Sequence, residues 1–273
     1  MAYVITTIHA TSNFPGTPHL NSPAGSRGSR GSPSPYLHGI LQKINAKGLT
    51  RPELIIFDCD GVLVDSEMLS CRIEEDLFHD IGLSISTGEI RARFVGLNYE
   101  TMAQQIESDY GVRLPDDFEA RCLDRFSQAI ETDLNAVSGI PELLATMPCP
   151  ICLASSSPLT RIAKSLAVTG LTDHFAGRIF SAQMVSRGKP APDLFLLAAQ
   201  ECAAEPDNCL VVEDSTHGIR AAVAAGMSSV GFTAGSHCSA TQSDALAAAG
   251  ADLLAADSRQ LASILNALCH VKT

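Results

Sequence analysis

The stretch Leu54–Ser66 has the sequence LIIFDCDGVLVDS and decides the fold. Its first four residues are all apolar, which is typical of a parallel strand buried on both faces. Two carboxylates, Asp58 and Asp60, follow directly, and Gly61 then allows a sharp turn. Alternate residues of an extended chain share a face, so both carboxylates can serve one site. Open α/β sheets bind ligands at the carboxyl ends of their strands, which makes this end the first candidate site.

The two carboxylates also indicate a cation. Like charges this close repel each other unless a cation or a shared proton offsets them. Mg²⁺ prefers oxygen ligands, so Asp58 and Asp60 favour a magnesium site. An acidic loop after a strand is the simpler alternative, and two acids alone do not exclude it.

Composition limits the possible partners. The chain has 273 residues, of which 45% are hydrophobic, enough for a sizeable core in one or two domains. The net charge is -11, without a Lys/Arg block in the part expected to fold, which argues against duplex nucleic acid and anionic membrane as partners. No apolar run approaches the length of a membrane-spanning helix. We expect a cytoplasmic protein that works as a monomer or weak homodimer.

The nine cysteines are scattered and odd in number, which fits reduced, buried thiols in an intracellular protein. Cys149 and Cys152 form a C-x-x-C pattern, for which a redox or zinc role is an alternative. No second pair accompanies them, so we interpret them as two unpaired thiols.

Residues 1–52 differ from the rest, because no Asp or Glu precedes Glu53. Residues 25–35 are a low-complexity Gly, Ser, Arg and Pro segment that cannot bury a core. We expect a disordered tail with at most one short helix over 40–47. Ser- and Arg-rich, acid-poor N-termini resemble organelle transit peptides, but a passive tail or a mis-assigned start codon is favoured here, because a clear amphipathic helix is lacking.

The segment 67–137 is expected to be an all-helical cap domain, because helical patterns follow one another there without a strand. It is strongly acidic: residues 67–133 hold 15 Asp/Glu against six Arg and no Lys. For nearly all of these charges a solvated helix face is the favoured interpretation. The expected helices are 67–81, 87–94, 100–110 and 116–133.

From Gly139 onward strand and helix patterns alternate, which implies right-handed βαβ crossovers and a parallel sheet. The sequence therefore predicts an α/β doubly wound core of residues 53–66 and 138–273, interrupted by the helical cap. The strands expected after 54–57 are 150–154, 178–181, 209–212, 229–232 and an edge strand at 252–254. The helices expected between and after them are 159–170, 194–203, 218–225 and 258–268.

Polar side chains follow these strands where a doubly wound sheet gathers them at one edge. Ser155 follows the second strand, Lys189 lies in the loop after the third, and Glu213 and Asp214 follow the fourth. Each alone has an ordinary explanation as a helix cap or surface charge. Together, a hydroxyl, an ammonium and two acidic clusters supply what phosphoryl transfer needs, namely positioning and charge neutralisation.

With these motifs the chain resembles the haloacid dehalogenase (HAD) superfamily, specifically its phosphatase and phosphomutase branch (β-phosphoglucomutase-like) with a helical C1 cap. The resemblance covers roughly residues 53–260. The matching motifs, in order, are DCDGVLVDS at 58–66, LAS at 153–155, KPAPD at 189–193, and EDS at 213–215 with Gly218.

The resemblance implies a role for each matching residue. Asp58 is the expected nucleophile, and Asp60 the general acid that then activates water. Lys189 is expected to hold the nucleophile and phosphate charges together. Ser155 is expected to bind a phosphoryl oxygen, with Ser156 and Gly61 also in the substrate site.

The resemblance also implies a magnesium ligand set. Asp58, Asp214 and the main-chain carbonyl of Asp60 are the expected ligands, and Glu213 assists directly or through water.

Several positions of this chain differ from those of members of the superfamily, and these differences narrow the choice of activity. Asp60 is present, whereas dehalogenases lack this second aspartate, and the cap has no lysine for the Schiff base of phosphonate-cleaving relatives. The mutase histidine twelve positions after the nucleophile is Ser70 here. The mutase cap arginine aligns with Asn98 or Tyr99, while His79 and Arg72 are nearby alternatives that we expect to face solvent.

Three hypotheses follow. The leading one is a Mg²⁺-dependent phosphatase that hydrolyses a small phosphorylated metabolite, a sugar or sugar-acid phosphate, through an aspartyl-phosphate. The alternative is an intramolecular sugar phosphomutase. A non-catalytic binding protein is disfavoured, because every catalytic position is filled.

Overall fold

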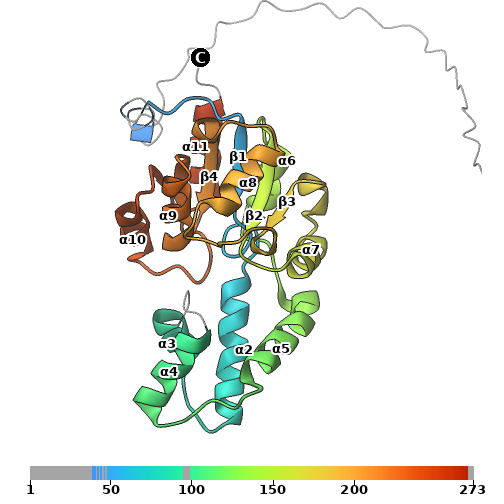
Figure 1. Ribbon diagram of the computed structural model, residues 1–273, viewed down its shortest axis with the longest axis vertical. Helices are drawn as coiled ribbons and strands as arrows, with labels where there is room; N and C mark the ends of the chain where they lie inside the picture. Colours follow the sequence, from blue (N-terminus) through green and yellow to red (C-terminus); the bar gives the residue numbers. More distant parts are fainter. Residues whose placement is uncertain are drawn as a thin grey trace, which may run out of the picture. The chain divides into compact units, whose positions relative to one another are not determined.

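The computed structural model describes residues 39, 40, 42, 44, 46, 48–94 and 99–269. Its centre is a six-stranded, all-parallel sheet with the order β3-β2-β1-β4-β5-β6 (Figure 1). The α/β doubly wound fold is confirmed. The strands are β1 (Leu54–Phe57), β2 (Ile151–Ser155), β3 (Ile179–Ser181), β4 (Cys209–Glu213), β5 (Ser228–Phe232) and β6 (Leu253–Ala255).

Strand β1 is fully buried because helices cover both faces of the sheet. Ile55 and Phe57 belong to one hydrophobic cluster, with α6, α7 and α11, whereas Leu54 and Ile56 belong to the other, with α8 and α9. The described core helices are α6 (Ile140–Ala145), α7 (Leu159–Val168), α8 (Asp193–Glu201), α9 (Thr216–Ala224), α10 (Gln242–Ala249) and α11 (Ser258–Cys269), with 3-10 turns η1 (Thr172–Phe175), η2 (Ala182–Met184) and η3 (Pro206–Asn208).

The strand order reverses beside β1, and this point positions the site. Chain neighbours β2 and β3 lie on one side of β1, while β4 pairs with its other edge. Phe57 is in register with Val212, so the residues that follow, Asp58 and Glu213, emerge side by side at the carboxyl edge. Ligands of open α/β sheets bind at such a reversal.

The expected helical cap is present between β1 and β2. It contains α2 (Ser66–Asp80), α3 (Thr87–Arg93), α4 (Tyr99–Tyr110) and α5 (Phe118–Asp133). Aromatic packing joins these helices, since the Phe118 ring stacks on Phe78 with 5.1 Å between centroids. None of the described helices is long and apolar enough to cross a membrane.

The described residues include a short helix before the expected start of the core domain. The described residues between Gly39 and Ala46 are helical, in agreement with the short helix expected over 40–47. Ile40 and Ile44 are both buried within the larger hydrophobic cluster. Apolar contacts therefore hold this helix on the domain, although the sequence analysis placed it within the tail. The rest of the predicted tail, residues 1–38, lies outside the described residues.

We expect Ile44→Ala to lower the free energy of unfolding by about 2–4 kcal/mol, because it leaves a cavity in the core. Ile44 is 1% exposed, so nearly the whole side chain contributes. Urea unfolding of the full chain measures the change. The control Thr50→Ala truncates a side chain at an exposed position and is expected to stay within about 0.5 kcal/mol. Equal stability of the two variants would instead support a passive segment.

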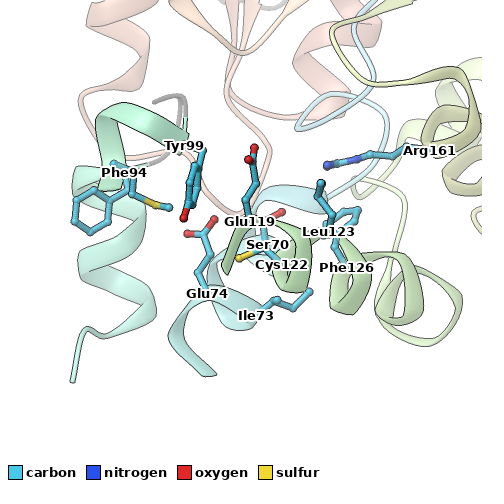
Figure 2. Close-up of a pocket in the computed structure, with 11 residues that line it drawn as sticks. Ser70, Ile73, Glu74, Phe94, Tyr99, Glu119, Cys122, Leu123, Phe126 and Arg161 are labelled. Atoms are coloured by element: carbon cyan, nitrogen blue, oxygen red, sulfur yellow. The ribbon is translucent and has the colours of Figure 1, made fainter. Parts of the chain in front are cut away.

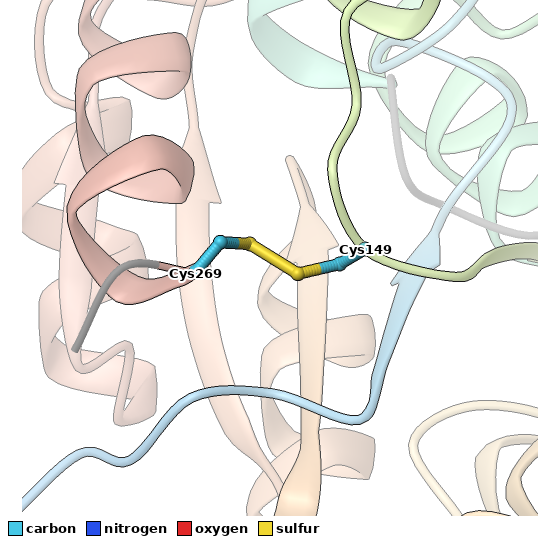
Figure 3. The surroundings of a disulfide bond; sticks show 2 residues. All are labelled: Cys149 and Cys269. Atoms are coloured by element: carbon cyan, nitrogen blue, oxygen red, sulfur yellow. A yellow bond between two sulfur atoms is a disulfide. The ribbon is translucent and has the colours of Figure 1, made fainter. Parts of the chain in front are cut away.

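A disulfide joins Cys149 and Cys269, with 6.7 Å between their Cα atoms (Figure 3). The prediction of unpaired cysteines is wrong for these two, whereas Cys152 is free as expected. The pair is 120 residues apart in sequence, so no local spacing indicates it. It arises because α11 packs against α6, which brings the end of α11 beside the segment that precedes β2.

Candidate functional site

A buried lysine ties together the ends of three strands. The Lys189 ammonium donates to Asp58 Oδ1 at 2.6 Å, to Glu213 Oε1 at 2.8 Å and to the Ala154 carbonyl at 3.0 Å. Its side chain is 4% exposed. These residues come from the ends of β1, β2 and β4, so Lys189 contacts the predicted nucleophile at the reversal of strand order. Its three N–H bonds are all used in this way.

The charges at this edge do not balance. Burial lowers the pKa of Lys189, but the carboxylates of Asp58 and Glu213 outweigh burial and raise it, so the ammonium stays charged. Burial raises the pKa of Asp58, with Lys189 acting in the opposite direction. The pKa of Asp214 is also raised, by burial and then by Glu213. Three buried acids therefore face one ammonium, an arrangement that favours a bound cation.

The acids fit a hard divalent cation. Oxygen atoms of Asp58, Glu213 and Asp214 all lie within 4.8 Å of one another. Carboxylate oxygens are the ligands that Mg²⁺ prefers. Gly61 keeps the space beside them open, because it has φ +80° and a Cβ there would collide with Asp214 Oδ2. The Gly61 N–H donates to the Val64 carbonyl at 2.8 Å, so the residue also closes the turn after β1.

Asp60 is held apart from this cluster by three donors. Its carboxylate accepts from Ser66 Oγ at 2.6 Å, Ser157 Oγ at 2.7 Å and Arg161 Nη2 at 3.0 Å. Burial raises the pKa of Asp60, but Arg161 and the two hydroxyls outweigh burial and lower it. Asp60 is thus kept as a carboxylate, the form that accepts a proton. Asp65 occupies the N-cap position of α2, and Ser66, the first residue of the helix, contacts Asp60.

The two predicted serines lie at the end of β2, with Ser155 as its last residue and Ser156 directly after it. Ser155 is buried, and its hydroxyl accepts from the Ser157 N–H at 3.0 Å, while Ser156 is exposed. The turn is fixed further by Ser181, whose hydroxyl donates to the Ser157 carbonyl at 2.7 Å. The structure therefore brings Ser155 and Ser156 to the edge that also holds Asp58. Their phosphate-binding roles stay predictions.

Sequence reasoning missed His237, which approaches the acids from the loop after β5. Its Nε2 lies 2.9 Å from Asp214 Oδ2, and both side chains are 7% exposed. The neighbouring Ser236 donates to Asp65 Oδ1 through its N–H at 3.0 Å and its hydroxyl at 2.8 Å, which fixes the loop over the site. The only signal in the sequence was a histidine beyond the end of a predicted strand.

Arg161 was missed as well, although it contacts both the core and the cap. Besides its ion pair with Asp60, its guanidinium lies 3.9 Å from the centroid of the Phe126 ring of α5. Arg161 is on α7, and none of the motifs includes it. It therefore links Asp60, the predicted general acid and base, to the cap.

A cavity of about 190 Å³ lies where Arg161 meets the cap helices (Figure 2). Ser70, at the position of the mutase histidine, lines it together with Glu74 and Tyr99. Asn98, the other position aligned with the mutase arginine, lies outside the described residues.

Comparison with known proteins shows which family this chain resembles. A protein-family model described as haloacid dehalogenase-like hydrolase matches residues 52–226. The 6-phosphogluconate phosphatase of Escherichia coli (strain K12) is 30% identical over 191 residues, which are 69% of this chain and 86% of that protein. Hexitol phosphatase B of the same strain is 31% identical over 180 residues, which are 64% of this chain and 81% of that protein.

Among solved structures, a conserved haloacid dehalogenase-like protein of unknown function from Agrobacterium tumefaciens str. C58 has a TM-score of 0.75 and 36% sequence identity. The match covers 80% of this chain and 99% of that chain. The family match spans the first strand, the cap and the strand that precedes Asp214. The chain belongs to the haloacid dehalogenase-like hydrolase family, and it is one of the family's phosphatases.

Proposed function

We propose that this phosphatase hydrolyses a sugar or sugar-acid phosphate with Mg²⁺ and forms an aspartyl-phosphate on Asp58. The observation that carries the proposal is the buried set of Asp58, Lys189, Glu213 and Asp214 at the reversal of strand order. A carboxylate nucleophile divides hydrolysis into two displacements, each of which needs charge neutralisation more than covalent assistance.

In the first displacement a carboxylate oxygen of Asp58 attacks phosphorus, and the bond from phosphorus to the ester oxygen breaks. Asp60 donates a proton to that leaving oxygen, for which its carboxyl must be protonated and free of Arg161. In the second displacement Asp60 takes a proton from water, and the water oxygen attacks phosphorus. Inorganic phosphate leaves, and the Asp58 carboxylate is restored.

Lys189 serves both steps from one position. It neutralises Asp58 while the anionic phosphate approaches, and Glu213 keeps its ammonium in place. Asp58 and Asp214 would hold Mg²⁺, with the Asp60 carbonyl and Glu213 as the further predicted ligands. When bound, Mg²⁺ supplies positive charge for the phosphoryl oxygens.

A panel of phosphate esters tests the proposal. With Mg²⁺ present, we expect inorganic phosphate to be released from hexose, hexitol or sugar-acid monophosphates. Excess EDTA is expected to abolish release because it removes the Mg²⁺ that neutralises the buried acids, and added Mg²⁺ is expected to restore release. Asp214→Asn is expected to raise the Mg²⁺ concentration needed. Full activity in EDTA would contradict the proposed metal site.

The phosphomutase alternative predicts a different product. Ser70 occupies the position of the mutase histidine. Tyr99, one of the two positions aligned with the mutase arginine, is a tyrosine. With β-glucose 1-phosphate and a trace of bisphosphate, we expect phosphate release to outrun formation of glucose 6-phosphate by NMR. Faster isomer formation would favour the mutase.

The remaining proposals come from the sequence. The core would comprise residues 53–66 and 138–273 and the cap residues 67–137. The substrate would be a soluble small-molecule ester, and the enzyme a cytoplasmic monomer or weak homodimer without nucleic-acid or membrane partners.

A further inference from the structure

The cavity at the cap shares one residue, Arg161, with the surroundings of the predicted catalytic carboxylate Asp60. Arg161 lines it and is also 3.0 Å from Asp60. On α2, Ser66 contacts Asp60, and Ser70 and Glu74 follow at intervals of four residues, so all three lie on one helix face. Each interval adds about 6 Å of helix rise. A substrate phosphorylated at one end therefore needs a chain of several carbons to reach Glu74.

Negatively charged side chains outnumber positively charged ones in this cavity. Glu74 of α2 and Glu119 of α5 contribute carboxylates, and Figure 2 shows both side chains rising from their helices toward the same space. Among the described lining residues, Arg161 is the one cation against these two carboxylates, and Asp60 pairs with it when Asp60 is ionised. Residues 95–98, which the structure does not describe, contain no charged side chain. The cavity is thus net negative.

The other lining groups suit hydroxyls on a carbon chain. Ionised carboxylates only accept hydrogen bonds, and each substrate hydroxyl can donate one. Ser70 and Tyr99 add two hydroxyls, while Phe126 supplies an apolar wall for the carbons. A substrate with a second anionic group at its far end would meet like charge instead.

We infer that this cavity receives the uncharged polyhydroxy end of a linear alditol or sugar phosphate, and that Glu74 and Glu119 select against sugar-acid phosphates. The inference rests on the proposed phosphatase function and narrows its substrate class. It favours hexitol phosphates over 6-phosphogluconate, although phosphatases named for each are among the relatives.

The test compares glucitol 6-phosphate with 6-phosphogluconate, which differ only in an alcohol or a carboxylate at C1. Burial, and then the charge of Glu67, raises the pKa of Glu74 to about 7. The assay is therefore run at about pH 8.5, where Glu74 is a carboxylate. We expect kcat/KM of the wild-type enzyme to be at least about tenfold higher for glucitol 6-phosphate.

Removing the charge is expected to reduce this preference. Glu74→Gln, which keeps the shape, should lower the ratio of the two kcat/KM values roughly fivefold, mainly by improving 6-phosphogluconate. Glu119→Gln, at an exposed position, should lower it less because of screening, and it provides the test if Glu74→Gln does not fold. The matched control Asp76→Asn removes an exposed charge from α2 outside the cavity and should leave the ratio unchanged.

Several outcomes would overturn the inference. They are equal or better turnover of 6-phosphogluconate by the wild-type enzyme, a ratio unaffected by both glutamate variants, and release from neither ester. If p-nitrophenyl phosphate or another ester still yields phosphate, the proposed phosphatase function stands while the inference fails. Absence of phosphate release from every ester with Mg²⁺ would contradict both.

Discussion

Asp58→Asn is expected to lower kcat by at least about a thousandfold, because an amide oxygen is a far weaker nucleophile than a carboxylate. The amide is nearly isosteric, and its oxygen can still accept from Lys189, so the fold should persist. The measurement is phosphate release from the best ester of the panel, with circular dichroism as a check of the fold.

A matched control separates this effect from a general loss of charge. Asp173→Asn makes the same chemical change at an exposed position of η1, and it should leave kcat unchanged. If Asp58→Asn retained substantial activity, with deamidation back to aspartate excluded by mass spectrometry, Asp58 would not be the nucleophile.

Lys189→Met is expected to impair both activity and stability. Phosphate release should fall at least about a hundredfold, because the charge beside Asp58 is lost. In EDTA the free energy of unfolding should also fall by about 3–5 kcal/mol, because Asp58 and Glu213 remain buried without their cation. Urea unfolding in EDTA measures this second effect.

Lys164→Met is the control for the lysine substitution. Lys164 is half-buried, contacts the Ser127 carbonyl and pairs with Glu131 at 3.0 Å on the surface of the cap. A surface pair contributes at most about 1 kcal/mol, so both activity and stability should stay close to those of the wild-type enzyme. If the two lysine variants had equal activity and stability, Lys189 would not have the proposed role in catalysis and in stabilising the buried acids.

Most of the fold could be predicted from periodicity. Apolar runs such as Leu54–Phe57 are unambiguous when both faces of a strand are buried, and each of the six strands lies within one or two residues of its expected place. The helices α6 and α10 were not predicted. The first is a helix of only six residues, and the second is Ala-rich with a weak amphipathic pattern, so neither gives a clear periodic signal.

The candidate site was predictable where it follows strands in sequence. Asp58, Lys189, Glu213 and Asp214 come together as expected, because parallel strands deliver their carboxyl ends to one edge. Arg161 and His237 reach the same edge from a helix and a loop, and only tertiary packing brings them there. The disulfide and the burial of Ile44 likewise depend on contacts between distant segments, which no local pattern records.

The central claim is that Asp58 carries the phosphoryl group, and the most direct test is to locate that group. The enzyme is mixed with a turned-over ester and Mg²⁺, quenched in acid during the first turnover, and digested for mass spectrometry. Borohydride reduction of a parallel sample converts an aspartyl-phosphate to homoserine and so marks the residue. The account predicts one phosphoryl group, labile to base, on the peptide containing Asp58, and homoserine at that position after reduction. Rapid phosphate release with no modified aspartate, or with the phosphoryl group on another residue, would contradict it.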